Sequence, residues 1–195
     1  MASLNFWFDF ASTYSYPAAM RIEEWAGDVE IAWRPILLGP IFAGQGWRDS
    51  PFNIYPAKGR YMWRDLERIC AAENLTFVRP DPFPQHSLRA ARVASALEGA
   101  DCARFCRAVF AAEFGRGRSI DGEDFIAGLL RQENLPAETL ARAGSDEVKM
   151  ALKASVEEAR SLGVFGAPSF TAADGELFWG FDRLEAALDW ARARS

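Results

Sequence analysis

The chain has 195 residues, of which half are hydrophobic and a quarter are charged, and this composition is typical of a globular protein with a buried core. Its formal net charge of −5 argues against a nucleic-acid partner, because such proteins usually carry a basic surface. No run approaches the ~18 to 20 apolar residues of a membrane-spanning helix, so we expect no membrane anchor either.

A strand, a helix and a second strand are predicted in the first 39 residues. Residues 4–10 form an almost continuous apolar run, which is typical of a buried parallel strand. A helical pattern follows over residues 13–25, and residues 29–38 predict the second strand. Gly39 and Pro40 then predict a turn.

The middle of the chain has a helical pattern. Between residues 40 and 162, apolar side chains recur three and four positions apart, which places them on one face of a helix. A loop is predicted at residues 49–53. The predicted helices span residues 59–73, 88–97, 102–114 and 122–131, and a long amphipathic stripe over residues 148–159 ends at Gly163.

The end of the chain returns to strands. Residues 169–172 and 176–179 flank a predicted turn at Asp174 and Gly175. A closing helix over residues 182–193 starts at Asp182, which with Glu185 resembles an acidic capping box. The order βαβ, helical insertion, αββα resembles that of an α/β protein with a thioredoxin-like fold and a large all-helical insertion.

This order divides the chain into two predicted domains. Residues 1–39 and 163–195, with the helix at about 146–162, are expected to form the thioredoxin-like domain. Residues 40–145 are expected to form the helical insertion domain.

The three cysteines do not form a disulfide framework. Cys70 lies on an apolar stripe, and Cys102 and Cys106 are spaced one helical turn apart, so we expect three buried thiols. His86 is the only histidine, which makes a structural metal site unexpected. Together with the absence of a secretory signal pattern, this predicts a protein of the reducing cytoplasm.

Ser12 stands where a thioredoxin-fold redox protein carries the first cysteine of its CxxC pair, and Ser15 stands in the second position. Without a thiol pair this site cannot cycle between dithiol and disulfide. We therefore expect the sulfur to arrive with a ligand, for which glutathione is the obvious candidate. The local sequence allows two roles for the Ser12 hydroxyl, one as a helix N-cap and one as a hydrogen-bond donor to a bound thiolate. The loop before the second pair of strands carries Ala167-Pro168, which suits a thioredoxin-fold proline loop.

Four separated motifs resemble a known family. They comprise residues 8–16 (FDFASTYSY), 56–61 (PAKGRY), 163–170 (GVFGAPSF), and 178–180 (FWG) together with 182–184 (DRL). In this order they resemble the 2-hydroxychromene-2-carboxylate isomerases, which group with the kappa-class glutathione transferases in the thioredoxin-like superfamily. The resemblance extends over nearly the whole chain.

The resemblance implies a set of glutathione-binding residues. Ser12 matches the catalytic serine that activates the glutathione sulfur. Ala167 matches the residue that binds the ligand backbone ahead of a cis-proline, here Pro168. The resemblance also assigns Asp182 to the γ-glutamyl amino group, although this residue is a candidate helix cap as well. Asn53 and Lys58 match polar positions of the site, with a turn residue and a surface charge as the respective alternatives.

The resemblance is weaker for the substrate side. Arg34 matches a basic position that meets the substrate carboxylate, although a solvated arginine at a strand end is equally compatible with the sequence. The aromatic residues proposed to wall a planar substrate are Trp7, Phe42, Trp47 and Tyr61, although most aromatic residues in such a chain belong to the core.

Two residues depart from the pattern of the family. His86 stands where relatives often have asparagine, and Phe181 stands where they often have a small polar residue. A polar residue at a helix start is the favoured interpretation of His86, ahead of a general base.

The function implied is glutathione-dependent isomerisation of an aromatic 2-oxo acid or its cyclic hemiketal, 2-hydroxychromene-2-carboxylate. A kappa-like glutathione transferase that conjugates electrophiles shares the same activating site and remains an alternative. A non-catalytic thioredoxin-fold binding module is an alternative of another class. A symmetric homodimer is expected from the resemblance alone.

Overall fold

The computed structural model describes residues 2–194, and its centre is one mixed sheet of four strands in the order β2-β1-β3-β4. Strand β1 (Ser3–Phe8) pairs in parallel with β2 (Glu30–Pro35). On its other side β1 pairs antiparallel with β3 (Ser169–Ala172), which pairs antiparallel with β4 (Leu177–Trp179). The predicted βαβ and ββα segments therefore meet in the sheet, as a thioredoxin-like fold requires.

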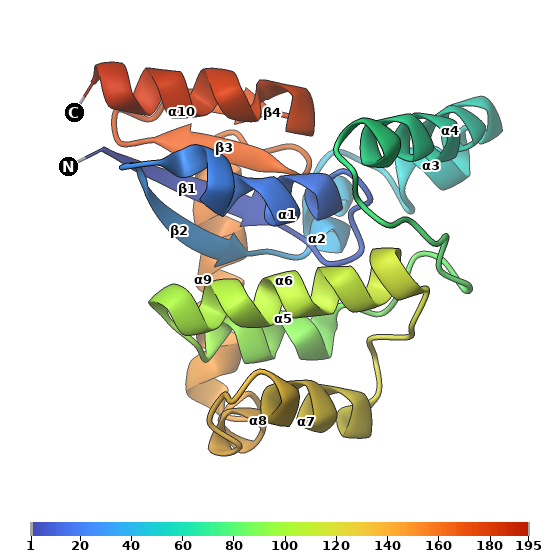
Figure 1. Ribbon diagram of the computed structural model, residues 1–195, viewed down its shortest axis with the longest axis vertical. Helices are drawn as coiled ribbons and strands as arrows, with labels where there is room; N and C mark the ends of the chain where they lie inside the picture. The colour runs from blue at the N-terminus through green and yellow to red at the C-terminus, as the bar shows by residue number, and fades with distance from the viewer. Residues whose placement is uncertain (1, 195) are drawn as a thin grey trace.

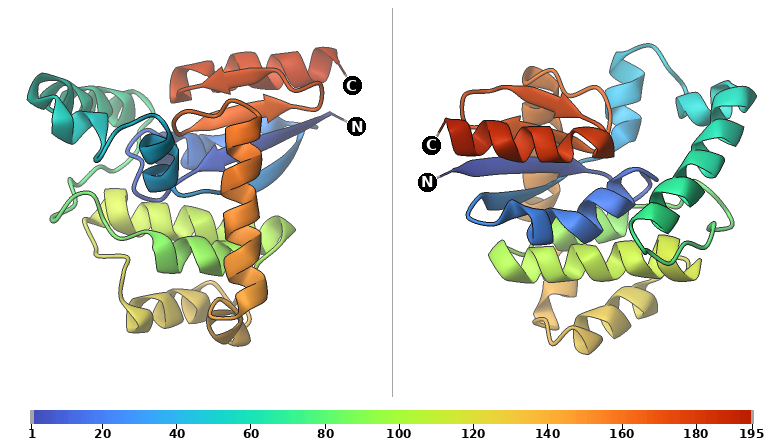
Figure 2. Two further views of the ribbon diagram at one scale, coloured as in Figure 1. Left: turned by 180° about the vertical axis from the view of Figure 1, so that it is seen from behind. Right: turned by 45° about the horizontal axis from the view of Figure 1, so that its top comes forward.

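Helices cover both faces of the sheet (Figures 1 and 2). Successive strand residues point to opposite faces, so Phe6 joins the large apolar cluster that includes residues of α1 (Ser15–Ala26) and α10 (Leu184–Ala193). The neighbouring Trp7 points the other way and joins a smaller cluster with residues of α9 (Asp146–Ser161). Both aromatic side chains are completely buried.

Seven helices lie between β2 and α9 in the chain. Helices α5 and α6 pack beyond β2, whereas α3 and α4 project to one side of the molecule, away from both termini (Figures 1 and 2). The seven helices are α2 (Leu38–Gly44), α3 (Pro51–Ile54), α4 (Pro56–Ala72), α5 (Leu88–Ser95), α6 (Gly99–Arg116), α7 (Glu123–Gln132) and α8 (Glu138–Arg142).

The helical segment shares its core with the sheet. The ring of Phe110 on α6 lies 5.8 Å from that of Phe8 and 5.0 Å from that of Phe10. All three side chains are completely buried in one cluster. The division into residues 1–39, 40–145 and 163–195 therefore follows chain order, whereas the apolar packing crosses it.

Two predicted loops are helical instead. The Gly39-Pro40 turn is wrong, because both residues lie in the first turn of α2. Proline is tolerated there because the first amide groups of a helix have no acceptor within it. The predicted loop at residues 49–53 contains the start of α3, where Pro51 follows the N-cap Ser50. Helix α8 was not predicted, since a helix of five residues carries little periodicity.

The capping box predicted at the last helix does not form. Asp182 lies in a single 3₁₀ turn, Phe181–Arg183, and α10 follows it with no side-chain hydrogen bond at its N-cap. The Asp182 carboxylate instead lies 3.6 Å from the guanidinium of Arg183.

The three thiols are free and buried, as predicted. Burial raises the pKa of Cys70 to about 11, and burial followed by the neighbouring Cys102 raises the pKa of Cys106 well above its usual range. Thiols with raised pKa values are poor nucleophiles at neutral pH. Within residues 2–194, no helix combines the length and apolar character needed to cross a membrane.

Candidate active site

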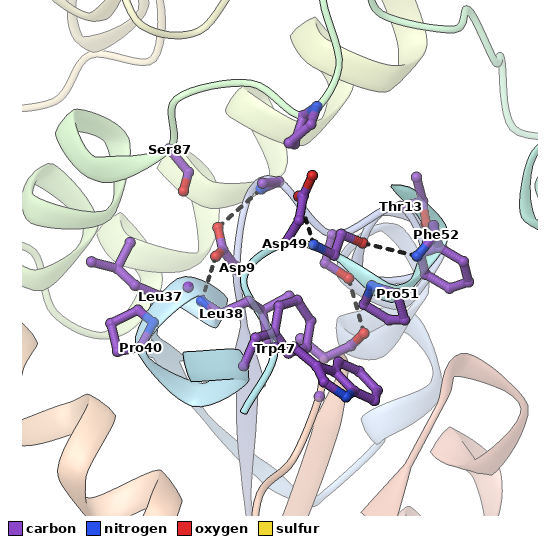
Figure 3. Close-up of a pocket in the computed structure, with 18 of the residues that line it drawn as sticks. Asp9, Thr13, Leu37, Leu38, Pro40, Trp47, Asp49, Pro51, Phe52 and Ser87 are labelled. Carbon is purple, nitrogen blue, oxygen red and sulfur yellow. Dashed lines mark hydrogen bonds between the residues drawn. The ribbon is translucent and has the colours of Figure 1, made fainter. Parts of the chain in front are cut away.

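A cleft of about 940 Å³ opens where the end of β1 and the proline loop face the helical segment (Figure 3). We call the first side, built by Asp9, Ser12 and Ala167, the thioredoxin wall. The opposite side, which we call the helical wall, is formed by the cleft residues Phe42, Trp47, Phe52 and Lys58.

Ser12 lies on the thioredoxin wall and is only 7% exposed. Its Oγ donates a hydrogen bond to the Ala167 carbonyl oxygen at 2.9 Å, across 155 positions of sequence. The N-cap role for the Ser12 side chain is wrong, because Tyr14 is the N-cap of α1 and no side chain caps that helix. The hydroxyl is therefore directed at the proline loop, three residues before the first turn of α1.

The proline loop is held by its own hydrogen bonds. The Ala167–Pro168 bond is cis, as the resemblance implies. Ser169 Oγ donates to the Gly166 carbonyl at 2.8 Å, and the Gly180 amide donates to the Pro168 carbonyl at 3.0 Å. A Cβ atom at Gly166 would lie 2.7 Å from Nε1 of Trp179, so glycine permits the close approach of this indole ring, which lines the cleft.

Asp9 is the most buried charged residue of the cleft, with 4% exposure. Its Oδ2 accepts the Leu38 amide at 2.7 Å and its Oδ1 accepts the Ala11 amide at 3.0 Å (Figure 3). Burial raises the pKa of Asp9, while hydrogen bonds from Leu38, Ser87 and Ala11 act against this rise. The carboxyl joins three segments: the loop after β1, the start of α2 and the loop before α5.

The helical wall is aromatic and carries positive charge. The rings of Phe42 and Trp47 lie 5.8 Å apart, and both residues line the cleft as predicted. Phe52 faces Tyr14 at 6.2 Å. Lys58 lines this wall with its ammonium group 5.0 Å from the Tyr55 ring. Such a surface suits a flat, anionic, aromatic ligand.

The structure does not place Arg34, Tyr61 or Trp7 in the lining of the cleft, and the contacts of Arg34 and Tyr61 with the substrate stay predictions. Trp7 is completely buried in an apolar cluster, which is a core role. Arg34 forms an ion pair with Glu158 of α9 and lies over the Trp7 ring at 4.9 Å. Tyr61 is 62% exposed on α4, and the Arg68 guanidinium lies 5.5 Å from its ring. Neither residue lines the cleft.

Asn53 and Asp182 also lie off the lining. The Asn53 amide donates to both Asp49 carboxylate oxygens, at 3.1 and 3.2 Å, which is the turn role that the sequence allowed. Asp182 is exposed three residues after Trp179, a residue that does line the cleft. Their contacts with glutathione remain predictions.

The two departures from the family pattern have different surroundings. His86 lines the cleft and is exposed. Phe181 instead packs against the apolar core, with its ring 5.6 Å from that of Trp25. Phe181 is therefore a packing residue.

The sequence prediction did not include Asp9, Arg48 or Trp179 among the site residues, although all three line the cleft. A signal existed for Asp9, which is a charged residue directly after a buried strand. Within residues 2–194, no group of three histidine, cysteine or acidic side chains is arranged to hold a metal ion.

Comparisons with known proteins agree with this architecture. A family model, the DsbA-like thioredoxin domain, matches residues 3–189. The chain is 30% identical over 194 residues to 2-hydroxychromene-2-carboxylate isomerase of Sphingobium xenophagum, covering 94% of each protein. A solved structure of 2-hydroxychromene-2-carboxylate isomerase superposes with a TM-score of 0.87 at 26% identity, covering 98% of this chain and 95% of that one.

More distant structures share the fold. A probable DsbA oxidoreductase from Streptomyces coelicolor has a TM-score of 0.77 at 20% identity, covering 99% of this chain and 91% of that one. The cytosolic disulfide reductase DsbM from Pseudomonas aeruginosa, solved with GSH, has a TM-score of 0.67 at 16% identity, covering 98% and 96% of the two chains.

Proposed function

The chain belongs to the DsbA-like thioredoxin domain family together with 2-hydroxychromene-2-carboxylate isomerase, and on that premise we propose that it is a glutathione-dependent isomerase. Its relative supports isomerase activity in general. The proposed substrates are aromatic 2-oxo acids and their cyclic hemiketals, of which 2-hydroxychromene-2-carboxylate is the reference compound.

The observation that carries the proposal is the 2.9 Å hydrogen bond from Ser12 Oγ to the Ala167 carbonyl at the edge of the cleft. It brings a hydroxyl donor to the proline loop at the position where disulfide oxidoreductases of this fold hold a thiol. The cysteines of this chain are buried in α4 and α6. A sulfur nucleophile at this site must therefore come from a ligand.

The Ser12 hydroxyl has a single proton, which it donates to the Ala167 carbonyl in this structure. We propose that on ligand binding this proton turns to the thiolate, and that the Ala167 carbonyl then accepts the cysteinyl amide instead. Lowering a thiol pKa from ~8.5 to ~6.5 requires about 2.7 kcal/mol of preferential thiolate stabilisation. A hydrogen bond to a charged acceptor supplies roughly 1.5 to 3 kcal/mol. The N-terminus of α1 adds about 0.3 to 1 kcal/mol, so the two together supply about 1.8 to 4 kcal/mol, a range that includes the stabilisation required without a cationic neighbour.

The remaining groups of the cleft suit the other parts of glutathione and the substrate. The Ala167 backbone is proposed to bind the cysteinyl backbone of glutathione. Lys58 and Arg48 offer positive charge for carboxylates on the helical wall. Asn53 is proposed as an outer polar contact, and Asp182 as the contact of the γ-glutamyl amino group. Phe42 and Trp47 are proposed to pack on the aromatic ring of the substrate.

In the proposed reaction the thiolate adds to the electron-poor conjugated carbon of the substrate. The double bond becomes a single bond about which the molecule rotates, the ring opens or closes, and the thiolate is expelled unchanged. The protein orients the two reactants, stabilises the thiolate and neutralises the substrate carboxylate.

A kappa-like glutathione transferase is the second candidate. The size of the cleft and the aromatic surface of its helical wall favour this possibility, because such a surface accepts varied apolar electrophiles.

We further propose a homodimer in a reducing cytoplasm, where the three thiols stay reduced. Sedimentation analysis tests the dimer.

The decisive experiment follows the ultraviolet spectrum of 2-hydroxychromene-2-carboxylate with the protein, with and without glutathione. The proposal expects conversion that depends on glutathione while glutathione is recovered unchanged. Conversion without glutathione contradicts the mechanism. Consumption of glutathione with an added electrophile, and no isomerisation, favours the transferase.

A further inference from the structure

A second carboxyl group is buried outside the lining of the cleft. Glu113 on α6 is completely inaccessible to solvent. Neither of its carboxylate oxygens has a hydrogen-bond partner in the described part of the chain. A charged carboxylate in such a place loses its hydration and gains nothing in return, so this side chain needs a physical explanation.

The packing brings the face of α6 that carries Glu113 against the segment that follows β1. Phe110 lies one turn before Glu113 on α6, and residues three apart share a helix face. The Phe110 ring packs 5.0 Å from that of Phe10, the residue next to Asp9. The Asp9 charge also acts on Glu113: burial first and the Asp9 charge second raise the pKa of Glu113 well above its usual range.

The surroundings decide which carboxyl holds a proton. Asp9 accepts two backbone amides, at 2.7 and 3.0 Å, and the Ser87 side chain lies on the same side (Figure 3). Glu113 has no such donors within residues 2–194. Helix α6 packs against α1, α5, α7 and β2. Within the described residues, no cation on these elements is among the causes that shift the pKa of Glu113. The hydrogen-bond donors therefore stabilise a negative charge on Asp9 and not on Glu113.

We propose that Asp9 and Glu113 form a carboxyl pair that holds one proton at neutral pH, with Asp9 as the catalytic base of the cleft and Glu113 as its positioning partner. Asp9 carries this role because it lines the cleft, whereas Glu113 is completely buried and does not line it. The proposal deepens the proposed function and rests on it for the identity of the substrate.

The step assigned to Asp9 is the opening of the cyclic hemiketal. The Asp9 carboxylate takes the proton of the hemiketal hydroxyl, and that oxygen forms the new carbonyl. The bond between the hemiketal carbon and the ring oxygen breaks, and its electron pair stays on the ring oxygen as a phenolate. Asp9 then returns the proton to the phenolate, so that no proton is consumed. When Asp9 accepts the proton, its buried negative charge is neutralised. The loss of this charge favours the proton transfer to Asp9.

Infrared spectroscopy across pH tests the pair without reference to turnover. The wild-type chain is expected to show a buried protonated carboxyl at neutral pH. Its buried carboxyls should titrate in two steps, and the step at higher pH should belong mainly to Glu113. Glu113→Gln removes the upper step and Asp9→Asn removes the lower step. Glu147→Gln, at an exposed residue of α9, keeps both. A neutral-pH spectrum without the protonated carboxyl, or one unchanged by Glu113→Gln, overturns the pair.

Kinetics test the base. Asp9→Asn is expected to lower kcat by a factor on the order of 10² and to abolish the acidic limb of the pH profile, while calorimetry still detects glutathione binding. Asp124→Asn, at an exposed residue of α7, keeps the profile. An unchanged kcat and pH profile in Asp9→Asn overturns the base. Absence of glutathione-dependent turnover in the wild-type chain contradicts the proposed function, and the infrared result still judges the pair by itself.

Discussion

The two walls of the cleft are built in different ways. The thioredoxin wall presents polar groups that are almost fully buried and fixed by hydrogen bonds, such as Asp9 and Ser12. The helical wall presents side chains that are partly or largely exposed, such as Phe52 and Lys58, on the helices that project from the molecule (Figure 1). We infer that the first wall determines the chemistry and that the second determines which substrate is accepted, since rigid elements hold reacting groups most accurately.

The largest expected difference between the walls is in stability. Phe10, next to Asp9, is completely buried and packs on Phe105 and Phe110. Phe10→Ala should lower the free energy of unfolding by about 3 to 5 kcal/mol. Phe52→Ala makes the same change on the helical wall, where the ring is only half-buried, and should lower the unfolding free energy much less while raising KM. Urea denaturation measures the unfolding free energy of both variants. Equal losses of unfolding free energy would contradict the contrast between the two walls.

The next effect concerns glutathione activation. Ser12→Ala removes the donor proposed to stabilise the thiolate. The loss of transition-state stabilisation should be about 1.5 to 3 kcal/mol, which lowers kcat/KM roughly 10- to 150-fold. The pKa of bound glutathione, followed by thiolate absorbance, should rise. A non-catalytic binding module predicts no change in thiol reactivity.

Ser15→Ala is the matched control for Ser12→Ala. Ser15 is buried three residues later, and its Oγ has no hydrogen-bond partner in the described structure. Removing this hydroxyl should leave thiolate formation unchanged and hold or raise the unfolding free energy. If Ser15→Ala reduces thiol activation as much as Ser12→Ala does, then the helix terminus as a whole, and not the Ser12 hydroxyl, is responsible.

The sequence predictions were more accurate for the thioredoxin wall than for the helical wall. Strand β3 was predicted to the residue, because an apolar run lies between a proline and a turn. The contact of Ser12 with the proline loop followed from the resemblance, because the thioredoxin-like fold brings these segments together. The ion pair of Arg34 could not be predicted, because its partner Glu158 lies 124 residues later on a helix whose position the local sequence does not specify.

Part of the missed chemistry was visible in the sequence. On α6 the buried residues Cys106, Val109, Phe110 and Glu113 follow one apolar stripe. An acidic residue on such a stripe indicates a buried carboxyl. The helical wall was harder to predict, because short helices such as α2 and α3 contain too few residues to show a period.

The pH dependence of stability gives a third test. A carboxyl whose pKa is raised in the folded state binds its proton more tightly there than in the unfolded chain. Stability is therefore lost as pH rises above 4.5, the ordinary pKa of Glu113, towards its raised value. Glu113→Gln abolishes this loss, so its advantage over the wild-type chain should grow by about 1.4 kcal/mol for each pH unit in that window.

Chemical denaturation of both chains at a series of pH values measures this difference. Glu147→Gln, on the exposed side of α9, should show no such growth with pH. A constant difference between Glu113→Gln and the wild-type chain would mean that Glu113 is not protonated preferentially in the folded state.

The smallest expected effect lies on the helical wall. Lys58 lines the cleft but is exposed, and an exposed charge contributes only about 0.2 to 1 kcal/mol to an ion pair because water and salt screen it. Lys58→Gln should therefore weaken glutathione binding by up to about fivefold, and the loss should shrink as salt is added. Lys149→Gln, whose ammonium pairs with Asp146 on α9, should not change the affinity. Calorimetric titration at low and high salt separates the outcomes. A large loss that does not respond to salt would place Lys58 in a desolvated contact with the ligand, and the helical wall would then share the fixed character of the thioredoxin wall.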